Sequence, residues 1–103
     1  MACGFLAKHG YQIIDRNYHC QGGEVDIVAK KGDEYYFVEV KTRVSIVCGY
    51  PEEAFDTAKQ YRVEEAALDY LAKKELEIDS WQLALVCVRV LKDNVVKCKL
   101  IIL

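Results

Sequence analysis

Two strand-like segments joined by a two-residue turn constrain the fold of this chain more than any other feature. Residues 24–31 and 34–42 alternate apolar and polar side chains on either side of Gly32-Asp33. Glycine at the first central position of a two-residue connection is typical of a type II′ hairpin turn. This turn fixes the register, because Lys31 must then face Glu34 and every further pair follows from it.

The register gives the predicted hairpin one entirely apolar face. Its opposed pairs are Val25–Val40, Ile27–Val38 and Ala29–Tyr36. An apolar sheet face has to be buried against another layer of secondary structure. We therefore expect this hairpin to belong to a packed sheet.

The opposite face of the hairpin brings two carboxylates together. Asp26 faces Glu39 there with Cβ atoms about 4.5–5.5 Å apart, and Glu24 faces Lys41. Like charges at this separation destabilise a sheet unless a shared proton, a cation or a divalent metal compensates them. Asp26, Glu39 and Lys41 thus form a candidate site with Glu24 at its edge. The alternative is an ordinary half-exposed strand on which Glu39 and Lys41 form a solvated pair.

The remaining sequence predicts a mixed α/β domain with the element order αβββαββ. The expected elements are a helix over residues 2–9, strands over 11–18, 24–31 and 34–42, a helix from Pro51 to Lys74, and strands over 81–91 and 95–103. We expect Ile13 and Ile14 in the core. The apolar face of the long helix is expected to comprise Ala54, Ala58, Tyr61, Leu68 and Ala72.

Composition excludes several classes of protein. The chain has 103 residues, the length of one domain, and its 52% apolar content excludes a disordered tail. No apolar run approaches the roughly 20 residues that a membrane span needs. A net charge of −2 argues against a basic coat protein for nucleic acid. The five cysteines form no CxxC pair, which favours reduced thiols and a cytoplasmic location.

Asp26 followed by Glu39-Val40-Lys41 resembles the signature of the restriction-endonuclease-like, PD-(D/E)xK, nuclease superfamily. The segments Gly23–Val28 and Phe37–Arg43 more narrowly resemble the YraN family of small bacterial proteins, in its Holliday-junction-resolvase-like branch. Further matching positions are Gly10, Tyr11, Ile14, Asn17, Gly49, Pro51, Glu53, Ala54, Lys59, Tyr70 and Leu71. The resemblance implies one restriction-endonuclease-like domain over residues 1–103, a mixed β-sheet flanked by helices.

The same resemblance implies hydrolysis of phosphodiester bonds in DNA, including branched or structured DNA, with Mg²⁺ or Mn²⁺ as cofactor. Asp26, Glu39 and the Val40 carbonyl would hold the metal, and Lys41 would orient water or stabilise developing charge. Four further residues are expected around this site or on the DNA: Glu24, Arg43, Lys59 and Gln60. Arg62, in contrast, is expected on a solvated helix face.

The sequence departs from the family pattern in two places. The family usually carries a glutamate in its first helix, at a position that would precede Met1, and residues 82–85 replace an Arg-Phe-Asp-Val segment. These departures suit an alternative, a non-catalytic module of the same fold that binds nucleic acid or protein. The apolar end of the chain, residues 100–103, would suit pairing with a second copy at a sheet edge. A homodimer would fit a two-fold branched substrate.

Overall fold

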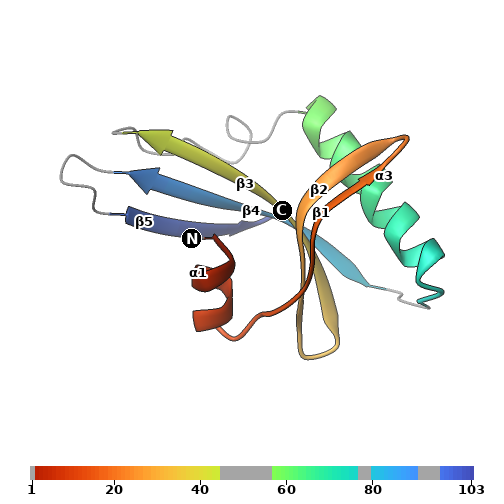
Figure 1. Cartoon of the computed structure of the whole chain (residues 1–103), viewed down its shortest axis with the longest axis horizontal. Helices are drawn as coiled ribbons and strands as arrows, with labels where there is room; N and C mark the ends of the chain where they lie inside the picture. The colour runs from red at the N-terminus through yellow and green to blue at the C-terminus, as the bar shows by residue number, and fades with distance from the viewer. Residues whose placement is uncertain (1, 45–56, 77–79, 91–95) are drawn as a thin grey trace.

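Five strands form one sheet in this computed structural model, which describes residues 2–44, 57–76, 80–90 and 96–103 (Figure 1). The elements are α1 (Ala2–Lys8), β1 (Gln12–Cys20), β2 (Gly23–Lys31), β3 (Glu34–Val44), α3 (Thr57–Lys73), β4 (Trp81–Val90) and β5 (Val96–Ile102). Their order along the described residues confirms the predicted αβββαββ arrangement. The predicted start of the long helix at Pro51 lies outside these residues.

The sheet is mixed, with the strand order β1-β2-β3-β4-β5. Its one parallel pair among the described strands is β3–β4, which runs in register from Tyr35–Trp81 to Val44–Val90. A parallel pair needs a crossover connection, and α3 lies in the segment that joins β3 to β4. The predicted α/β class is confirmed, and the arrangement is compatible with a restriction-endonuclease-like fold.

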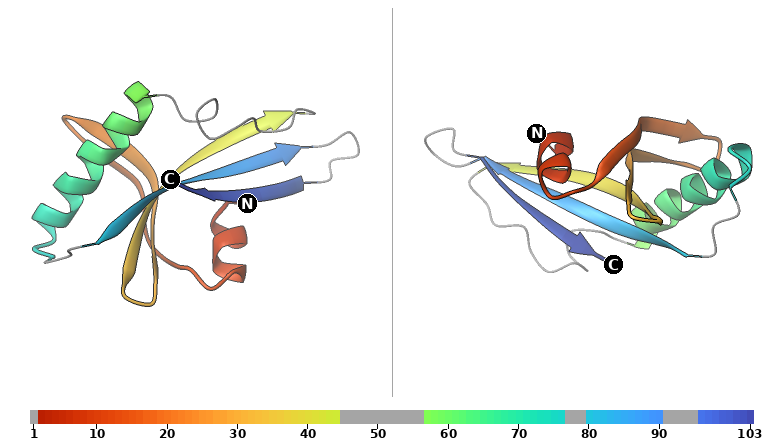
Figure 2. Two further views of the ribbon diagram at one scale, coloured as in Figure 1. Left: turned by 180° about the vertical axis from the view of Figure 1, so that it is seen from behind. Right: turned by 90° about the horizontal axis from the view of Figure 1, so that it is seen from below.

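Two hydrophobic clusters lie on the two faces of the central strands. Phe37 and Leu85 belong to the cluster packed against α3, whereas their neighbours Val38 and Val86 belong to the cluster that includes Leu6 of α1. This alternation follows from the two-residue period of a strand. Figure 2 shows the two helices apart from each other, with strands between them. The central strands are therefore buried on both faces, as the middle of an α/β sheet requires.

The predicted apolar face of the long helix is wrong. Tyr61 and Leu68 are 60% and 53% exposed, Ala58 and Ala72 are exposed as well, and Ala54 lies outside the described residues. The buried side chains of α3 are Val63, Ala66, Ala67, Tyr70 and Leu71. These follow the i, i+3, i+4, i+7, i+8 spacing of a helix that covers a sheet. The adjacent alanines lack bulk and so allow α3 to approach the sheet closely.

The prediction for Ile14 in the first strand is also wrong, because its side chain is 37% exposed. The register between β1 and β2 shifts between Ile13 and Asp15, so Ile14 lies at a bulge and has no partner in this ladder. Ile13 packs, partly buried, against the cluster of α1.

The strands β2 and β3 separate partway along their length. Their ladder runs from Lys31–Glu34 to Ile27–Val38, which confirms the predicted register over these pairs, and it ends there. Beyond this point β2 continues with β1 beside α3, while β3 continues with β4 in another direction (Figure 1). Strict alternation predicts Val25 on the same face as Ile27. Val25 instead packs with Val28 in the cluster against α3, whereas Ile27 belongs to the cluster that includes α1. The predicted acidic pair follows directly after this fork.

Candidate functional site

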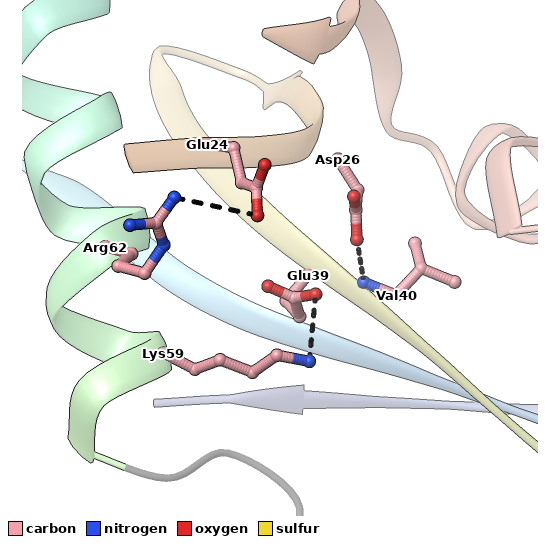
Figure 3. A network of polar contacts seen from close by, with 6 residues as sticks. All are labelled: Glu24, Asp26, Glu39, Val40, Lys59 and Arg62. Atoms are coloured by element: carbon pink, nitrogen blue, oxygen red, sulfur yellow. Dashed lines mark hydrogen bonds and ion pairs between the residues drawn. The ribbon is translucent and has the colours of Figure 1, made fainter. Parts of the chain in front are cut away.

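Asp26 is the first residue of β2 beyond the fork, and its carboxylate bridges the gap to β3. The backbone N–H of Val40 donates to Asp26 Oδ2 at 2.8 Å (Figure 3). The side chain thus replaces the backbone hydrogen bond that a continued ladder would have supplied. One carboxylate oxygen of the half-buried Asp26 is held in this way against the backbone of β3.

Glu39 lies on β3 just past the same fork, and only 13% of its side chain is exposed. Burial raises the pKa of Glu39 from its ordinary value of 4.5 to about 7, with a further contribution from the neighbouring Asp26 carboxyl group. Lys59 acts in the opposite direction and lowers this pKa. The two carboxyl groups are therefore close enough to interact, although the ladder ends before it would pair their residues.

Helix α3 supplies two cations that face these acids. Lys59 Nζ lies 3.7 Å from Glu39 Oε1, and Arg62 Nη2 lies 3.9 Å from Glu24 Oε1. The two basic residues are three positions apart, so they share one side of the helix, and both side chains extend toward the strands in Figure 3. Arg62 is 53% exposed, as predicted for a solvated helix face, and it also pairs with the half-exposed Glu24.

A close approach of backbones holds α3 in this position. A Cβ atom added at Gly23 would lie 1.9 Å from the carbonyl oxygen of Arg62. No other residue type allows the start of β2 to pack this closely, and the contact lies directly beside Glu24. The sequence pattern Gly-Glu at residues 23–24 therefore has a physical basis. Gly23 allows α3 to pack closely against β2, and Glu24 pairs with Arg62 of that helix.

Glu24 does not lie opposite Lys41, as the extended hairpin register predicted. It contacts Arg62 and also His19, whose Nδ1 is 3.3 Å from Glu24 Oε2. His19 and Glu24 are direct partners in the β1–β2 ladder. Reasoning from the sequence missed this contact, although the two-residue connection Gln21-Gly22 between β1 and β2 fixes this second register in the same way.

The other predicted site residues lie around this centre. Lys41 is half-buried on β3, two residues beyond Glu39 and next to Cys87 of β4. The structure describes Arg43 by its backbone, which pairs with Arg89. Gln60 is half-buried on α3 beside Lys59. The structure therefore brings together Asp26, Glu39, Val40, Lys59, Glu24 and Arg62, with Lys41 adjacent along the strand.

The donor set fits a hard divalent cation. Asp26 and Glu39 offer carboxylate oxygens, and the carbonyl of Val40 lies on the same side of β3 as its N–H, the side that faces Asp26. Over the described ranges, no group of three or more His, Cys, Asp or Glu side chains could hold a metal. Mg²⁺ typically uses one or two carboxylates and retains several waters, whereas a structural zinc site needs four protein ligands. The residues present therefore suit Mg²⁺ or Mn²⁺.

The comparisons with known proteins identify the family. The model of "Uncharacterised protein family UPF0102" matches residues 1–95. UPF0102 proteins of Geobacter metallireducens and Caldicellulosiruptor saccharolyticus are each 47% identical over 74 residues, 72% of this chain and 61% and 62% of their own lengths. A UPF0102 protein of Syntrophus aciditrophicus is 44% identical over 77 residues, 75% of this chain and 61% of its own.

The chain thus spans about three fifths of the length of these curated relatives. In the part of the chain that the structure describes, no helix is long and apolar enough to cross a bilayer. The family resemblance carried by the Gly-Glu-Val-Asp and Phe-Val-Glu-Val-Lys segments is confirmed by the family match and by these relatives. The chain belongs to the UPF0102 family.

Proposed function

We propose that this protein is a Mg²⁺-dependent nuclease that hydrolyses phosphodiester bonds in DNA. One observation carries the proposal: the carboxyl groups of Asp26 and Glu39 meet at the fork between β2 and β3 with little access to water. Burial, with a further contribution from the neighbouring Asp26, raises the pKa of Glu39 to about 7, so ionisation of both groups destabilises the fold. Structures keep unfavourable groups of this kind at functional sites more often than elsewhere.

The residues of the chain would divide the work as follows. Asp26 and Glu39, with the carbonyl of Val40, would hold the metal, and the hydrogen bond from Val40 N–H orients the Asp26 carboxylate for it. The bound metal supplies a polarised phosphoryl oxygen and a more acidic water. Lys41 would orient the attacking water or stabilise the charge that develops on the phosphate. Lys59, which pairs with Glu39 at 3.7 Å, would contact a substrate phosphate when a metal is bound.

Glu24 and Arg62 would form the edge of this site. Their contact, at 3.9 Å and about half exposed, contributes little to stability by itself. It does place a guanidinium group within one helical turn of Lys59. Arg43 and Gln60 remain proposed DNA contacts, since they lie on the same strand and helix as the central residues.

The assembly and location of the protein are proposals as well. β5 is an edge strand of the described sheet, and Val96, Ile102 and Leu103 on it or just after it are 38%, 47% and 37% exposed. Exposed apolar edges favour pairing with another strand, which supports a homodimer through β5. Cys3, Cys20 and Cys98 are free thiols, which supports a reducing, cytoplasmic environment.

A second candidate function is a non-catalytic binding module for nucleic acid or protein. It is favoured by the segment that departs from the family pattern, because Ala84 is fully buried in the α1 cluster and contributes no polar group. It is also favoured by the small number of acids at the fork, since the described residues hold no group of three or more metal-ligating side chains.

A cleavage assay separates the two functions. Purified protein is incubated with linear and four-way-junction DNA in Mg²⁺ or Mn²⁺, alongside Asp26→Asn and Lys41→Ala. The matched controls are Asp33→Asn in the exposed β2–β3 turn and Lys97→Ala on exposed β5. We expect metal-dependent nicking by the wild type and both controls, and none by the two site variants. Absence of nicking on either DNA, together with absence of divalent-metal binding, would favour the binding module.

A further inference from the structure

The ladder between β1 and β2 is interrupted at one position beside Asp26. Arg16 pairs with Ile27 and Tyr18 pairs with Val25, but Asn17 and Asp26, which stand opposite each other between these pairs, form no pair. Asn17 has a φ of 53°, in the left-handed region that asparagine tolerates better than most residues. Asp26 therefore has no ladder partner in either neighbouring strand, β1 or β3.

This interruption lines an open hollow on the α1 side of the fork. The hollow has a volume of about 440 Å³ and is lined by Arg16 and Asn17 of β1, Asp26 and Ile27 of β2, Val40 of β3 and Cys3 of α1. A second hollow of about 730 Å³ shares Cys3, Arg16 and Asn17, so the two meet at these residues. Arg16 and Asn17 therefore stand where an open surface leads to the metal-binding carboxylate and to the Val40 backbone.

The chemistry of this position suits a phosphate group. Arg16 is exposed, and within the described ranges its guanidinium makes no ion pair. Its backbone N–H donates to the carboxylate of Asp15 at 2.9 Å. Asp15 lines the larger hollow of about 730 Å³ but not the smaller hollow of about 440 Å³. A guanidinium offers five N–H donors in a planar arrangement that matches phosphate oxygens, and the Asn17 amide adds further donors. Arg16 and Asn17 therefore offer donors for a phosphate at the smaller hollow, where the negative charge of Asp26 would be offset by the proposed metal.

We propose that Arg16 and Asn17 form a phosphate-binding subsite that holds a DNA backbone phosphate next to the one being cleaved. The proposal rests on the proposed function for its substrate. The subsite adds a second element to the proposed DNA-binding surface. Helix α3 supplies Lys59 and Arg62 from one side of the fork. Strand β1 supplies Arg16 and Asn17 from the other side. The strand carrying the scissile bond passes between them over Asp26 and Glu39.

The affinity for four-way-junction DNA tests this subsite. It is measured by fluorescence anisotropy over a range of salt concentrations, with Ca²⁺ as the divalent ion so that binding is read separately from cleavage in Mg²⁺. Arg16→Gln should weaken binding about tenfold and reduce the slope of log affinity against log salt by about one. Asn17→Gly, which keeps the left-handed backbone accessible, should weaken binding about threefold through loss of the amide. Lys97→Gln removes one charge from β5 at the far edge of the sheet and is the control.

Thermal unfolding of each variant checks that the fold is retained. Equal affinities of Arg16→Gln, Asn17→Gly and Lys97→Gln would overturn the subsite while leaving nuclease activity of the wild type intact. Wild-type protein that binds no junction DNA would overturn the subsite as well, and absence of cleavage would then overturn the nuclease with it. Selective loss of binding in the Arg16 and Asn17 variants of a chain that does not cleave would support the subsite and contradict the nuclease.

Discussion

At the scale of single residues, Glu39 is the side chain whose state depends most on its surroundings. Burial and the carboxyl group of Asp26 raise its pKa to about 7, so the folded protein retains this proton at pH values where the unfolded chain has released it. Stability falls with rising pH wherever the native state binds more protons than the unfolded state. The contribution of Glu39 is therefore most favourable below pH 4.5 and is lost progressively up to about pH 7.

Replacing Glu39 by glutamine should remove this pH dependence. Because a shift of one pKa unit corresponds to about 1.4 kcal/mol, the wild type should lose on the order of 2–3 kcal/mol relative to Glu39→Gln between pH 4.5 and pH 7.5. Urea unfolding in metal-free buffer at several pH values measures the difference. Parallel pH profiles of the two proteins would contradict the raised pKa.

Asp26 has a structural task that can be separated from metal binding. In Asp26→Asn the amide oxygen would still accept the hydrogen bond from Val40 N–H, whereas Asp26→Ala would leave this N–H without a partner. We expect Asp26→Ala to be about 1–2 kcal/mol less stable than Asp26→Asn, the cost of one unsatisfied backbone donor. Both variants lose the same charge, so electrostatic relief at Glu39 cancels in the comparison. Equal stability of the two variants in denaturant unfolding would show that this hydrogen bond contributes nothing.

At the scale of elements, the site depends on how α3 docks against the start of β2. The carbonyl of Arg62 occupies the space where a side chain at residue 23 would begin. The rest of the contact is made by the buried face of α3, from Val63 to Leu71, against Phe37 and Val28. This packing holds the helix where Lys59 contacts Glu39 and Arg62 contacts Glu24.

Gly23→Ala should consequently push α3 away from β2. We expect a loss of about 1–3 kcal/mol, the usual cost of overpacking a close contact. Gly4→Ala is the control, because a Cβ atom there meets nothing within 4 Å and alanine favours the helix. Denaturant unfolding of both variants gives the two values. A Gly23→Ala protein as stable as Gly4→Ala would mean that the helix does not depend on this approach.

The sequence predicts the elements better than it predicts how they meet. The Gly32-Asp33 turn sets the register of β2 and β3 as far as Ile27–Val38, because a short turn acts locally. It does not reveal where the strands separate, because a short turn carries no information about the elements that pack against β2 and β3 farther along. For the same reason Glu24 was predicted beside Lys41 and is found beside Arg62 and His19.

The helix shows a second reason why the sequence was insufficient. Tyr61 and Leu68 are larger than Ala66 and Ala67, yet they are exposed and the two alanines are buried. Small residues at the centre of the docked face allow the helix to pack closely. The acids Asp26 and Glu39, in contrast, could be predicted as neighbours. The Gly32-Asp33 turn sets the register, and each acid lies one residue beyond the last paired residues, Ile27 and Val38.

At the scale of the whole molecule, the fork brings the acids Asp26 and Glu39 together with the cation Lys59. The sheet separates into a β1–β2 arm beside α3 and a β3–β4–β5 arm (Figure 1). Asp26 of β2 and Glu39 of β3 are next to Ile27–Val38, the last pair of the β2–β3 ladder. The net charge of −2 gives no overall attraction for DNA, so the proposed DNA binding would depend on local cations. Lys59 and Arg62 are engaged with acids in this structure. A divalent metal on Asp26 and Glu39 would free Lys59 for phosphate and reverse the sign of the local field.

Titration calorimetry of Mn²⁺ against the metal-free protein tests the central claim most directly. We expect one binding site at pH 8, abolished by Asp26→Asn and unchanged in Asp33→Asn. The affinity should be weaker at pH 6, because Glu39 must release its proton before it can bind the metal. Wild-type protein without measurable Mn²⁺ binding at pH 8, or Asp26→Asn that binds as the wild type does, would contradict a metal site at the fork.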